Sequence, residues 1–222
     1  MKRIPEPELM NDVAQAIAYT QADFTEPHNR VIGFFQNTFG TTRISGYVLD
    51  LGCGPGDIAF RFARAYPDCL VHGIDGAEAM LNCGRGLLAA APDIRGRVEL
   101  IHGFLPTAAL PRLKYDIVIS NSILHHLKTP VVLWKTVKRY ATVGAPVFIV
   151  DLKRPGSPEE ARKLVEVYSK NEPEILKKDF LNSLLAAYEV EEIKSQLREE
   201  NIEFLDVKEI SDRHILVSGY MR

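Results

Sequence analysis

The residues best suited to chemistry lie in VLDLGCGPGDIAF, residues 48–60, where an apolar run ends in an acidic residue, three glycines and a proline. Gly52, Gly54 and Gly56 alternate after Asp50. Glycine adopts turns that other residues avoid and lets a ligand approach the backbone without meeting a Cβ. A tight turn that binds nothing is the simpler interpretation, but the alternate glycines directly after Asp50 argue against it. We expect a ligand against this backbone, with a carboxylate beside it.

The glycine spacing separates two kinds of ligand. A dinucleotide fingerprint reads G-x-G-x-x-G and turns a helix N-terminus toward a pyrophosphate, whereas this chain reads G-x-G-x-G. Asp50 would also repel a pyrophosphate and attract a cation. Asp57 is expected to cap the helix that begins near Ile58. A ribose-bearing cation without phosphate therefore suits the site better, and a nicotinamide dehydrogenase is the weakest interpretation.

A second carboxylate follows in HGID, which ends at Asp75 before Gly76 and a helix from Ala77. A carboxylate about 20 residues beyond the glycine turn accepts hydrogen bonds from both ribose hydroxyls in dinucleotide-binding sheets. Each charge-assisted bond contributes about 1.5 to 3 kcal/mol. The alternative is that Asp75 only caps the helix. Asp50 and the glycines in the same crevice favour the ribose.

These residues must be positioned by a sheet, because short β-rich runs alternate with helical patterns along the chain. Most of the runs are continuously apolar, as in parallel strands buried on both faces. The runs are Tyr47 to Leu51, Leu70 to Ile74, Val98 to His102, Tyr115 to Ser120 and Pro146 to Val150. The alternation predicts a doubly wound, Rossmann-like α/β fold with right-handed crossovers, and ligands bind beyond the carboxyl ends of its strands.

Both ends of the chain depart from this repeat. Apolar stripes from Leu9 and from Val31 predict two helices before the first strand, which we interpret as a helical lid over residues 1–44. Residues 152–180 form a charged, helical insertion, followed by a helix read from Phe180 and continued to Leu197. Two last strands, near 203–207 and 214–220, form a hairpin that adds an antiparallel member to a seven-stranded, mostly parallel sheet. Residues 1–222 are expected to be a single domain.

Composition narrows the class further. With 222 residues, 46% hydrophobic, and a net charge of −2, the chain can bury one full core and carries no basic run for a polyanion, so nucleic acid is a poor partner. We expect no membrane segment and no secretory signal, hence a cytoplasmic protein. The three cysteines, Cys53, Cys69 and Cys83, match no metal-site spacing, so reduced thiols and no metal are expected. The oligomeric state stays open, a dimer included.

VLDLGCGPGD closely resembles the first motif of the class I S-adenosylmethionine-dependent methyltransferases, and the resemblance covers residues 45–151 and the closing hairpin. It implies S-adenosylmethionine as cofactor, S-adenosylhomocysteine as product, and an enzyme of EC 2.1.1 type. By that resemblance Asp75 takes the ribose and Asp50 lies near the methionine ammonium. The implied cofactor-binding residues are Asp50, Gly52, Cys53, Gly54, Asp75, Gly76, Gly103, Phe104, Leu105, Asn121 and Tyr19.

One position departs from the family pattern. After the third strand these enzymes often carry an acidic residue that accepts from the adenine amine, within a Gly-Asp-Ala type sequence. This chain reads IHGFLPT, so Phe104 stands where that aspartate is expected. We expect Phe104 or Leu105 to pack on the adenine while main-chain groups meet its polar edge.

The stretch SNSILHHL after the fourth strand faces the methyl group in the family, and it lacks the N-P-P-Y signature of enzymes that methylate nucleic-acid bases. Asn121 and His125 are the predicted catalytic residues, with Ser120 and Ser122 as further candidates. For His125 two interpretations stay open, a general base or a helix-start histidine packed on the sheet. His126 is expected to be solvent-facing or structural, and His102 structural.

The lid and the insertion are expected to choose the acceptor. Lid candidates are Tyr19, Asp23, Phe24, His28 and Arg30. In the insertion, Arg154 suits a substrate carboxylate or phosphate, although a surface ion pair with Asp151 or Glu159 is equally compatible. Tyr168 and Tyr188 are predicted substrate contacts, with core packing as their alternative.

The leading hypothesis is methyl transfer from S-adenosylmethionine to a small-molecule acceptor, on oxygen, nitrogen or carbon, by direct displacement. One alternative is a protein that binds S-adenosylmethionine without turnover, as a sensor or partner subunit. The other is a transferase that uses a modified, carboxylated sulfonium, for which Arg30 or Arg154 would supply the extra positive charge.

Overall fold

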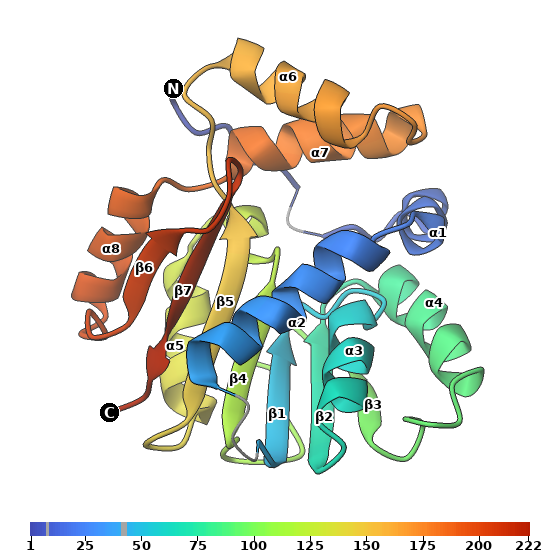
Figure 1. Ribbon diagram of the computed structural model, residues 1–222, viewed down its shortest axis with the longest axis vertical. Coiled ribbons are helices and arrows are strands. Elements are labelled where there is room, and N and C mark those ends of the chain that lie inside the picture. Colours follow the sequence, from blue (N-terminus) through green and yellow to red (C-terminus); the bar gives the residue numbers. More distant parts are fainter. Residues whose placement is uncertain (8, 41–43) are drawn as a thin grey trace.

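A seven-stranded sheet in the order β3-β2-β1-β4-β5-β7-β6 forms the centre of the molecule (Figure 1). The computed structural model describes residues 1–7, 9–40 and 44–222, so residues 8 and 41–43 of the expected lid lie outside the described residues. The strands are β1 (Gly46–Leu51), β2 (Cys69–Asp75), β3 (Val98–His102), β4 (Ile117–Asn121), β5 (Pro146–Leu152), β6 (Asp206–Glu209) and β7 (His214–Tyr220).

The sheet confirms the predicted doubly wound fold. β1 lies between β2 and β4 and is parallel to both, and β5 extends the parallel set. β7 is antiparallel to β5 and to β6, as the expected hairpin requires. The first hairpin strand begins at Asp206, later than the predicted 203–207, because the chain first makes a turn in which Ile202 and Leu205 are buried.

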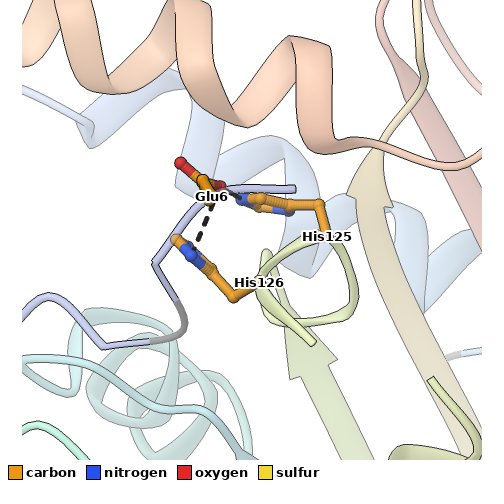
Figure 2. Close-up of side chains that lie close together, drawn as sticks. All are labelled: Glu6, His125 and His126. Carbon is orange, nitrogen blue, oxygen red and sulfur yellow. Dashed lines mark ion pairs between the residues drawn. The ribbon is translucent and has the colours of Figure 1, made fainter. Parts of the chain in front are cut away.

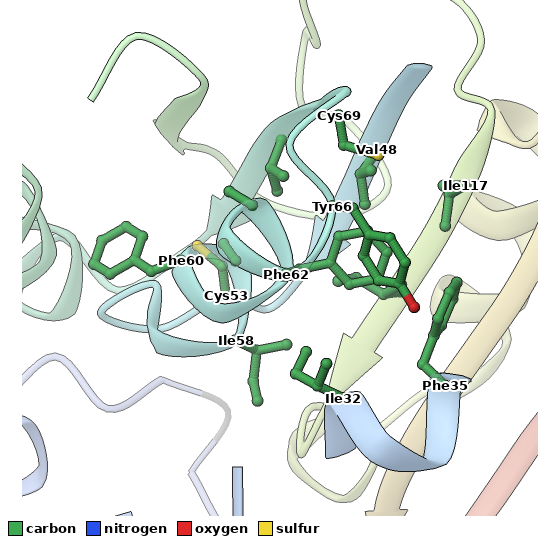
Figure 3. Close-up of a cluster of buried hydrophobic side chains, with 14 of the residues drawn as sticks. Ile32, Phe35, Val48, Cys53, Ile58, Phe60, Phe62, Tyr66, Cys69 and Ile117 are labelled. Atoms are coloured by element: carbon green, nitrogen blue, oxygen red, sulfur yellow. The ribbon is translucent and has the colours of Figure 1, made fainter. Parts of the chain in front are cut away.

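Helices cover both faces of this sheet. They are α1 (Val13–Gln21), α2 (Thr25–Phe39), α3 (Asp57–Ala65), α4 (Glu78–Ala89), α5 (Val131–Tyr140), α6 (Pro158–Tyr168), α7 (Glu174–Ala186) and α8 (Val190–Glu199), with a 3₁₀ turn η1 (Leu124–His126). Side chains of α2 and α3 share one core cluster with the sheet, and those of α5 and α8 share the other. Figure 3 shows α2 and α3 meeting, with Phe35 near Phe62 and Tyr66.

The two N-terminal helices play different parts. α2 is amphipathic as predicted, and Phe35 and Phe39 are buried against the sheet, so this helix belongs to the core layer as well as to the cavity wall. In α1 the predicted apolar stripe of Leu9, Val13, Ala16 and Ile17 is buried only at Ala16, since Val13 is 64% and Ile17 is 44% exposed. Through Ala16 this helix packs against α4.

The insertion places α6 and α7 beyond the carboxyl ends of the strands (Figure 1). The predicted continuous helix from Phe180 to Leu197 is wrong, because the chain leaves the helix after Ala186 and Tyr188 forms a bridge to Lys153. α8 then restarts where the Glu192 carboxylate accepts from the Glu189 backbone N–H. Among the described helices none has both the length and the apolarity to cross a bilayer.

Candidate active site

A cavity of about 450 Å³ lies at the carboxyl ends of the strands. Its walls come from the β1–α3 turn, the ends of β2 and β4, the α1–α2 junction, and α6 and α7. The predicted residues that line it are Tyr19, Asp23, Phe24, His28, Arg30, Asp50, Gly52, Cys53, Gly54, Asp75, Gly76, Gly103, Phe104, Leu105, Asn121, Ser122, His125 and Tyr168. Three further predicted candidates, Ser120, Arg154 and Tyr188, do not line this cavity.

The glycine turn is built by packing as well as by backbone freedom. The N–H groups of Gly52 and Cys53 both donate to the Ile74 carbonyl, which ties the end of β1 to β2. A Cβ on Gly52, where φ is +72°, would lie 2.5 Å from the Ile123 side chain, so only glycine fits there. A Cβ on Gly54 would meet nothing within 4 Å. The backbone at Gly54 is thus an open wall of the cavity, free for ligand approach.

Asp75 fastens this turn from the neighbouring strand. Its Oδ2 accepts from the Gly54 N–H at 2.8 Å and its Oδ1 accepts from the Ala77 N–H at 2.7 Å. It does not cap α4, whose N-cap position is Ala77, without a side-chain bond. Burial raises the pKa of Asp75, while the backbone bonds act in the opposite direction. Each carboxylate oxygen keeps a further lone pair, so ribose hydroxyls can still be accepted.

Asp50 is the most unusual group in the cavity. The residue is 1% exposed, and its Oδ2 is buried without a hydrogen-bond partner among the described residues. Burial, and then the charge of Asp75, raise the pKa of Asp50 to about 7. A buried carboxylate without a partner is costly unless a cation or donor arrives. The cavity is therefore electrostatically prepared for a positively charged ligand.

Aromatic lid residues close the cavity near these carboxylates. Tyr19 lies 4.8 Å from Phe24 and Phe24 stacks on His28 at 5.1 Å between ring centroids. The predicted capping role of Asp57 is wrong, because its carboxylate bonds His28 Nδ1 at 2.5 Å and Arg61 at 2.7 Å instead. This pairing joins α2 to α3 and fixes the lid over the β1–α3 turn.

Phe104 lines the cavity beside the end of β2. It is 51% exposed, and a Cβ on Gly76 would lie 3.1 Å from its ring, so ring and β2 end are in close contact. His102 holds the neighbouring chain by its bond to the Gly76 carbonyl, in keeping with the structural role expected for it. An exposed aromatic ring at a cavity edge is suited to pack against a flat heterocycle.

The segment after β4 lines the cavity and contains a residue with strained backbone geometry, Ser122. Asn121 Nδ2 donates to Ser122 Oγ at 3.2 Å, and Ser122 has φ of +61°, a region that non-glycine residues avoid. Its N–H donates to the Val150 carbonyl, which holds the turn in place. Strained backbone of this kind persists where surrounding bonds enforce it and often lies at functional sites.

His125 is buried and paired with Asp151 at the end of β5. The His125 Nδ1 to Asp151 Oδ1 distance is 2.6 Å, and Asp151 also accepts from the N–H groups of Leu124 and Leu152. Burial lowers the pKa of His125, but the charge and hydrogen bond of Asp151 outweigh it, so the net direction is upward. Because a carboxylate only accepts, Nδ1 carries a proton and Nε2 is the atom left to act.

Two neighbours of His125 were not predicted for the site. Glu6 Oε1 lies 3.6 Å from His125 Nε2 and 3.3 Å from His126 Nδ1 (Figure 2). His126 also lines the cavity and its side chain is only 14% exposed, so the solvent-facing expectation is wrong. The sequence signal for Glu6 is weak, a lone carboxylate between Pro5 and Pro7.

The N-terminal segment is held in place by Arg3. Its guanidinium donates to the carbonyls of Ala186 and His125, and it stacks over the Tyr188 ring at 4.2 Å. The Ile4 N–H donates to the Leu185 carbonyl. These bonds hold the N-terminal segment between η1 and α7. Glu6 therefore lies close to His125, which is more than a hundred residues away in sequence.

Of the three predicted substrate contacts, the structure places one in the cavity. Tyr168 lines it beneath the Arg213 guanidinium. Arg154 is 7% exposed and donates to Glu189 and Glu192, joining the end of β5 to α8, and it does not line the cavity. Tyr188 is buried with its hydroxyl on the Leu127 carbonyl. Arg154 thus joins the residues after β5 to the start of α8, and Tyr188 joins the connection between α7 and α8 to the residue after η1.

Known proteins match this chain in sequence and fold. Residues 48–166 match the family model described as a methyltransferase domain. An uncharacterized methyltransferase of Mycobacterium bovis is 32% identical over 108 residues, 49% of this chain and 51% of the relative. The chain thus spans about half the length of that curated relative.

Solved structures share the fold over most of the chain. A SAM dependent methyltransferase from Aquifex aeolicus superposes with a TM-score of 0.69 at 18% identity, covering 95% of this chain and 99% of that one. The plantazolicin methyltransferase BpumL, in complex with a pentazolic desmethylPZN analog and SAH, gives 0.69 at 15% identity, covering 95% and 90%.

The raised pKa of the buried Asp50 carboxylate predicts that the free energy of unfolding depends on pH. A pKa near 7 in the folded state and 3.8 in the unfolded state means that the folded protein binds more protons, so stability falls as pH rises between these values. Asp50→Asn should therefore be more stable than the parent, with an advantage that grows by about 2 kcal/mol from about pH 5.5 to about pH 8.5. Urea unfolding of the cofactor-free protein measures it.

The exposed Asp206→Asn serves as the matched control and should show no such trend. A stability difference between Asp50→Asn and parent that does not change with pH would contradict the buried, unpaired state of this carboxylate.

Proposed function

Because the chain belongs to the methyltransferase domain family, we propose that it transfers the methyl group of S-adenosylmethionine to a small-molecule acceptor. The observation that carries the proposal is the pair of carboxylates, Asp50 and Asp75, in one cavity with an open glycine backbone. A ligand that is cationic, bears a ribose and lacks phosphate complements this arrangement. The family match and the fold shared with known methyltransferases support the same donor.

The donor is proposed to lie along the β1–α3 turn. Asp75 accepts the ribose hydroxyls and Asp50 faces the methionine ammonium, while the ring of Phe104 packs on the adenine. The backbone of Gly54 faces the sugar and methionine portions, as its open Cβ direction allows. The remaining contacts proposed for the donor come from Tyr19, Gly52, Cys53, Gly76, Gly103, Leu105 and Asn121.

The acceptor is proposed to sit beneath α6 and α7, beside η1. The cavity there is bounded by Tyr168 of α6 and by the buried His125. Because the lid and the insertion both contribute walls to a cavity of about 450 Å³, a small molecule suits the site better than a macromolecule. We propose no nucleic acid as acceptor and leave the atom that is methylated open among oxygen, nitrogen and carbon.

The transfer itself is a single displacement. A lone pair of the acceptor attacks the methyl carbon as the carbon–sulfur bond breaks, and the sulfonium leaves as the neutral thioether of S-adenosylhomocysteine. Alignment of nucleophile, carbon and sulfur can contribute about 7 to 11 kcal/mol. Asn121 and His125 are proposed to lie at the acceptor end, where His125 Nε2 would accept a proton from an acceptor that carries one.

A carboxylated sulfonium is less well supported. Arg30 pairs with Glu26 at 2.6 Å and Arg154 pairs with Glu189 and Glu192, so each arginine already has a carboxylate partner. A sensor or partner protein without turnover would share the donor site, and only product analysis separates it from an enzyme.

The ribose assignment predicts a clear loss on substitution. Asp75→Ala should weaken S-adenosylmethionine binding by at least about tenfold, since charge-assisted bonds worth about 1.5 kcal/mol or more are lost. Asp75→Asn keeps a side-chain oxygen that can accept from the Gly54 N–H. Its affinity for S-adenosylmethionine should therefore lie between those of the parent and Asp75→Ala. Calorimetric titration gives the dissociation constants, and an unchanged affinity of the alanine variant would reject the assignment.

The ammonium assignment predicts a pH dependence of donor binding. Asp50 faces Asp75 as its charged neighbour, and its pKa of about 7 means that it is protonated in the free protein below that pH. A cationic ligand binds the ionised form, so the dissociation constant should rise roughly tenfold for each pH unit below 7. The slope should vanish in Asp50→Asn, and an equal slope in both proteins would exclude Asp50.

Donor binding and turnover are tested together. The protein should bind S-adenosylmethionine and S-adenosylhomocysteine in calorimetric titrations and should not bind NADH. Incubation with the donor and a metabolite extract should yield a product one methyl group heavier by mass spectrometry. Binding of NADH in place of the sulfonium pair would overturn the proposed function.

A further inference from the structure

We propose that Glu6, His125 and His126 bind a divalent transition-metal ion, zinc being the best match, at the acceptor end of the cavity. Each residue offers one ligand-type atom, and these atoms lie within 4.8 Å of one another. Zinc bonds of about 2.0 to 2.1 Å in a tetrahedron place neighbouring ligands about 3.3 to 3.4 Å apart. The two measured separations from Glu6 Oε1, 3.3 Å and 3.6 Å, match that spacing closely.

The first support is a pair of polar atoms that lack partners. Glu6 Oε1 and His126 Nδ1 are both buried without a hydrogen bond among the described residues. The His126 ring has a backbone hydrogen bond to Pro7, whose carbonyl must accept because proline has no N–H. Since Nδ1 has no partner among the described residues, we assign the donating N–H to Nε2. The Nδ1 lone pair therefore faces a carboxylate oxygen. Two facing acceptors are costly unless a cation or a proton lies between them.

The second support is that every ligand is oriented by another group. The Asp151 carboxylate accepts from His125 Nδ1–H, the Pro7 carbonyl accepts from the His126 ring, and Ser183 Oγ donates to Glu6 Oε2 at 3.3 Å. Metal-binding histidines almost always donate their other N–H to a carboxylate or carbonyl, which fixes the ring and the tautomer. The arrangement thus has outer partners as well as ligands.

The types of the three ligand atoms favour one class of metal ion, and their number leaves one coordination position free. Two imidazoles and one carboxylate suit zinc or a similar transition metal, whereas magnesium and calcium prefer oxygen ligands. Three protein ligands leave a fourth position open. His125 and His126 both line the cavity, so that position faces the acceptor space. The sequence did not predict this site, because its ligands come from segments more than a hundred residues apart.

The site also indicates the kind of acceptor, and this step rests on the proposed function. A hydroxyl or thiol at the fourth position would have its pKa lowered by the ion. Its proton passes to solvent, its lone pair forms the bond to the methyl carbon, and the carbon–sulfur bond breaks to give S-adenosylhomocysteine. In this arrangement His125 holds the ion and does not itself accept the proton. An oxygen or sulfur acceptor is therefore favoured.

The test measures ion binding on the whole chain without the methyl donor. After chelator treatment and dialysis, calorimetric titration with zinc should show one equivalent bound, and cobalt should give the visible absorption of a tetrahedral site. Glu6→Gln and His126→Gln should each weaken zinc binding by at least about 100-fold. His102→Gln, which alters an exposed histidine outside the cluster, should leave the affinity unchanged.

Each result decides the proposal. Titration of the same variants with S-adenosylmethionine shows whether they are folded, because the residues proposed to bind the methyl donor are unchanged in them. Weakened zinc binding with retained donor binding supports the site. The absence of stoichiometric zinc binding by the parent would overturn the proposal, and so would a zinc affinity of Glu6→Gln and His126→Gln equal to that of the parent. Either result would favour a shared proton between Glu6 and His126. Zinc binding without donor binding would reject the proposed function and keep the metal site.

Discussion

The side of the cavity next to η1 depends on one buried carboxylate, that of Asp151 at the end of β5. It is 3% exposed and accepts from the N–H groups of Leu124 and Leu152 and from His125 Nδ1. Burial acts to raise the pKa of Asp151, but His125 and the hydrogen bonds outweigh it and lower the net value, so this charge is well compensated. Through these bonds the turn after β4 is fixed to the next strand, and the orientation of His125 follows.

Asp50 shows the opposite solution to burying a carboxylate. At the same carboxyl ends of the strands, Asp50 Oδ2 has no hydrogen-bond partner among the described residues, and burial and the charge of Asp75 raise the pKa of Asp50. The strained φ of Ser122 is a second local cost at this edge. Such costs persist where the rest of the fold is stable enough to bear them, and they gather at functional sites. Asp151 is thus a structural charge that is paired within the fold, whereas Asp50 is the charge proposed to pair with the ligand.

Local sequence patterns predicted the strands and the glycine turn well, and they gave no indication of where the N-terminal segment lies. The apolar strands and the glycine turn follow from short-range rules, so β1 to β5 and the positions of Asp50 and Asp75 could be read directly. Glu6 could not, since its position depends on bonds from Arg3 to Ala186 and His125, over more than a hundred residues. The break between α7 and α8 likewise depends on the bridge of Tyr188 to Lys153.

The family match covers one part of the cavity wall and leaves out another. The family match runs from 48 in β1 to 166 in α6, and it therefore includes the glycine turn, Asp75 and the turn after β4. Glu6, Tyr19 and Ser183 lie outside it, yet Tyr19 lines the cavity and the other two build the surroundings of His125 and His126. The family match thus includes the residues proposed to bind the methyl donor, whereas Glu6 and Ser183, which contact the His125 and His126 region, lie outside it. Substitutions of these two residues therefore change the proposed acceptor side and leave the proposed donor site intact.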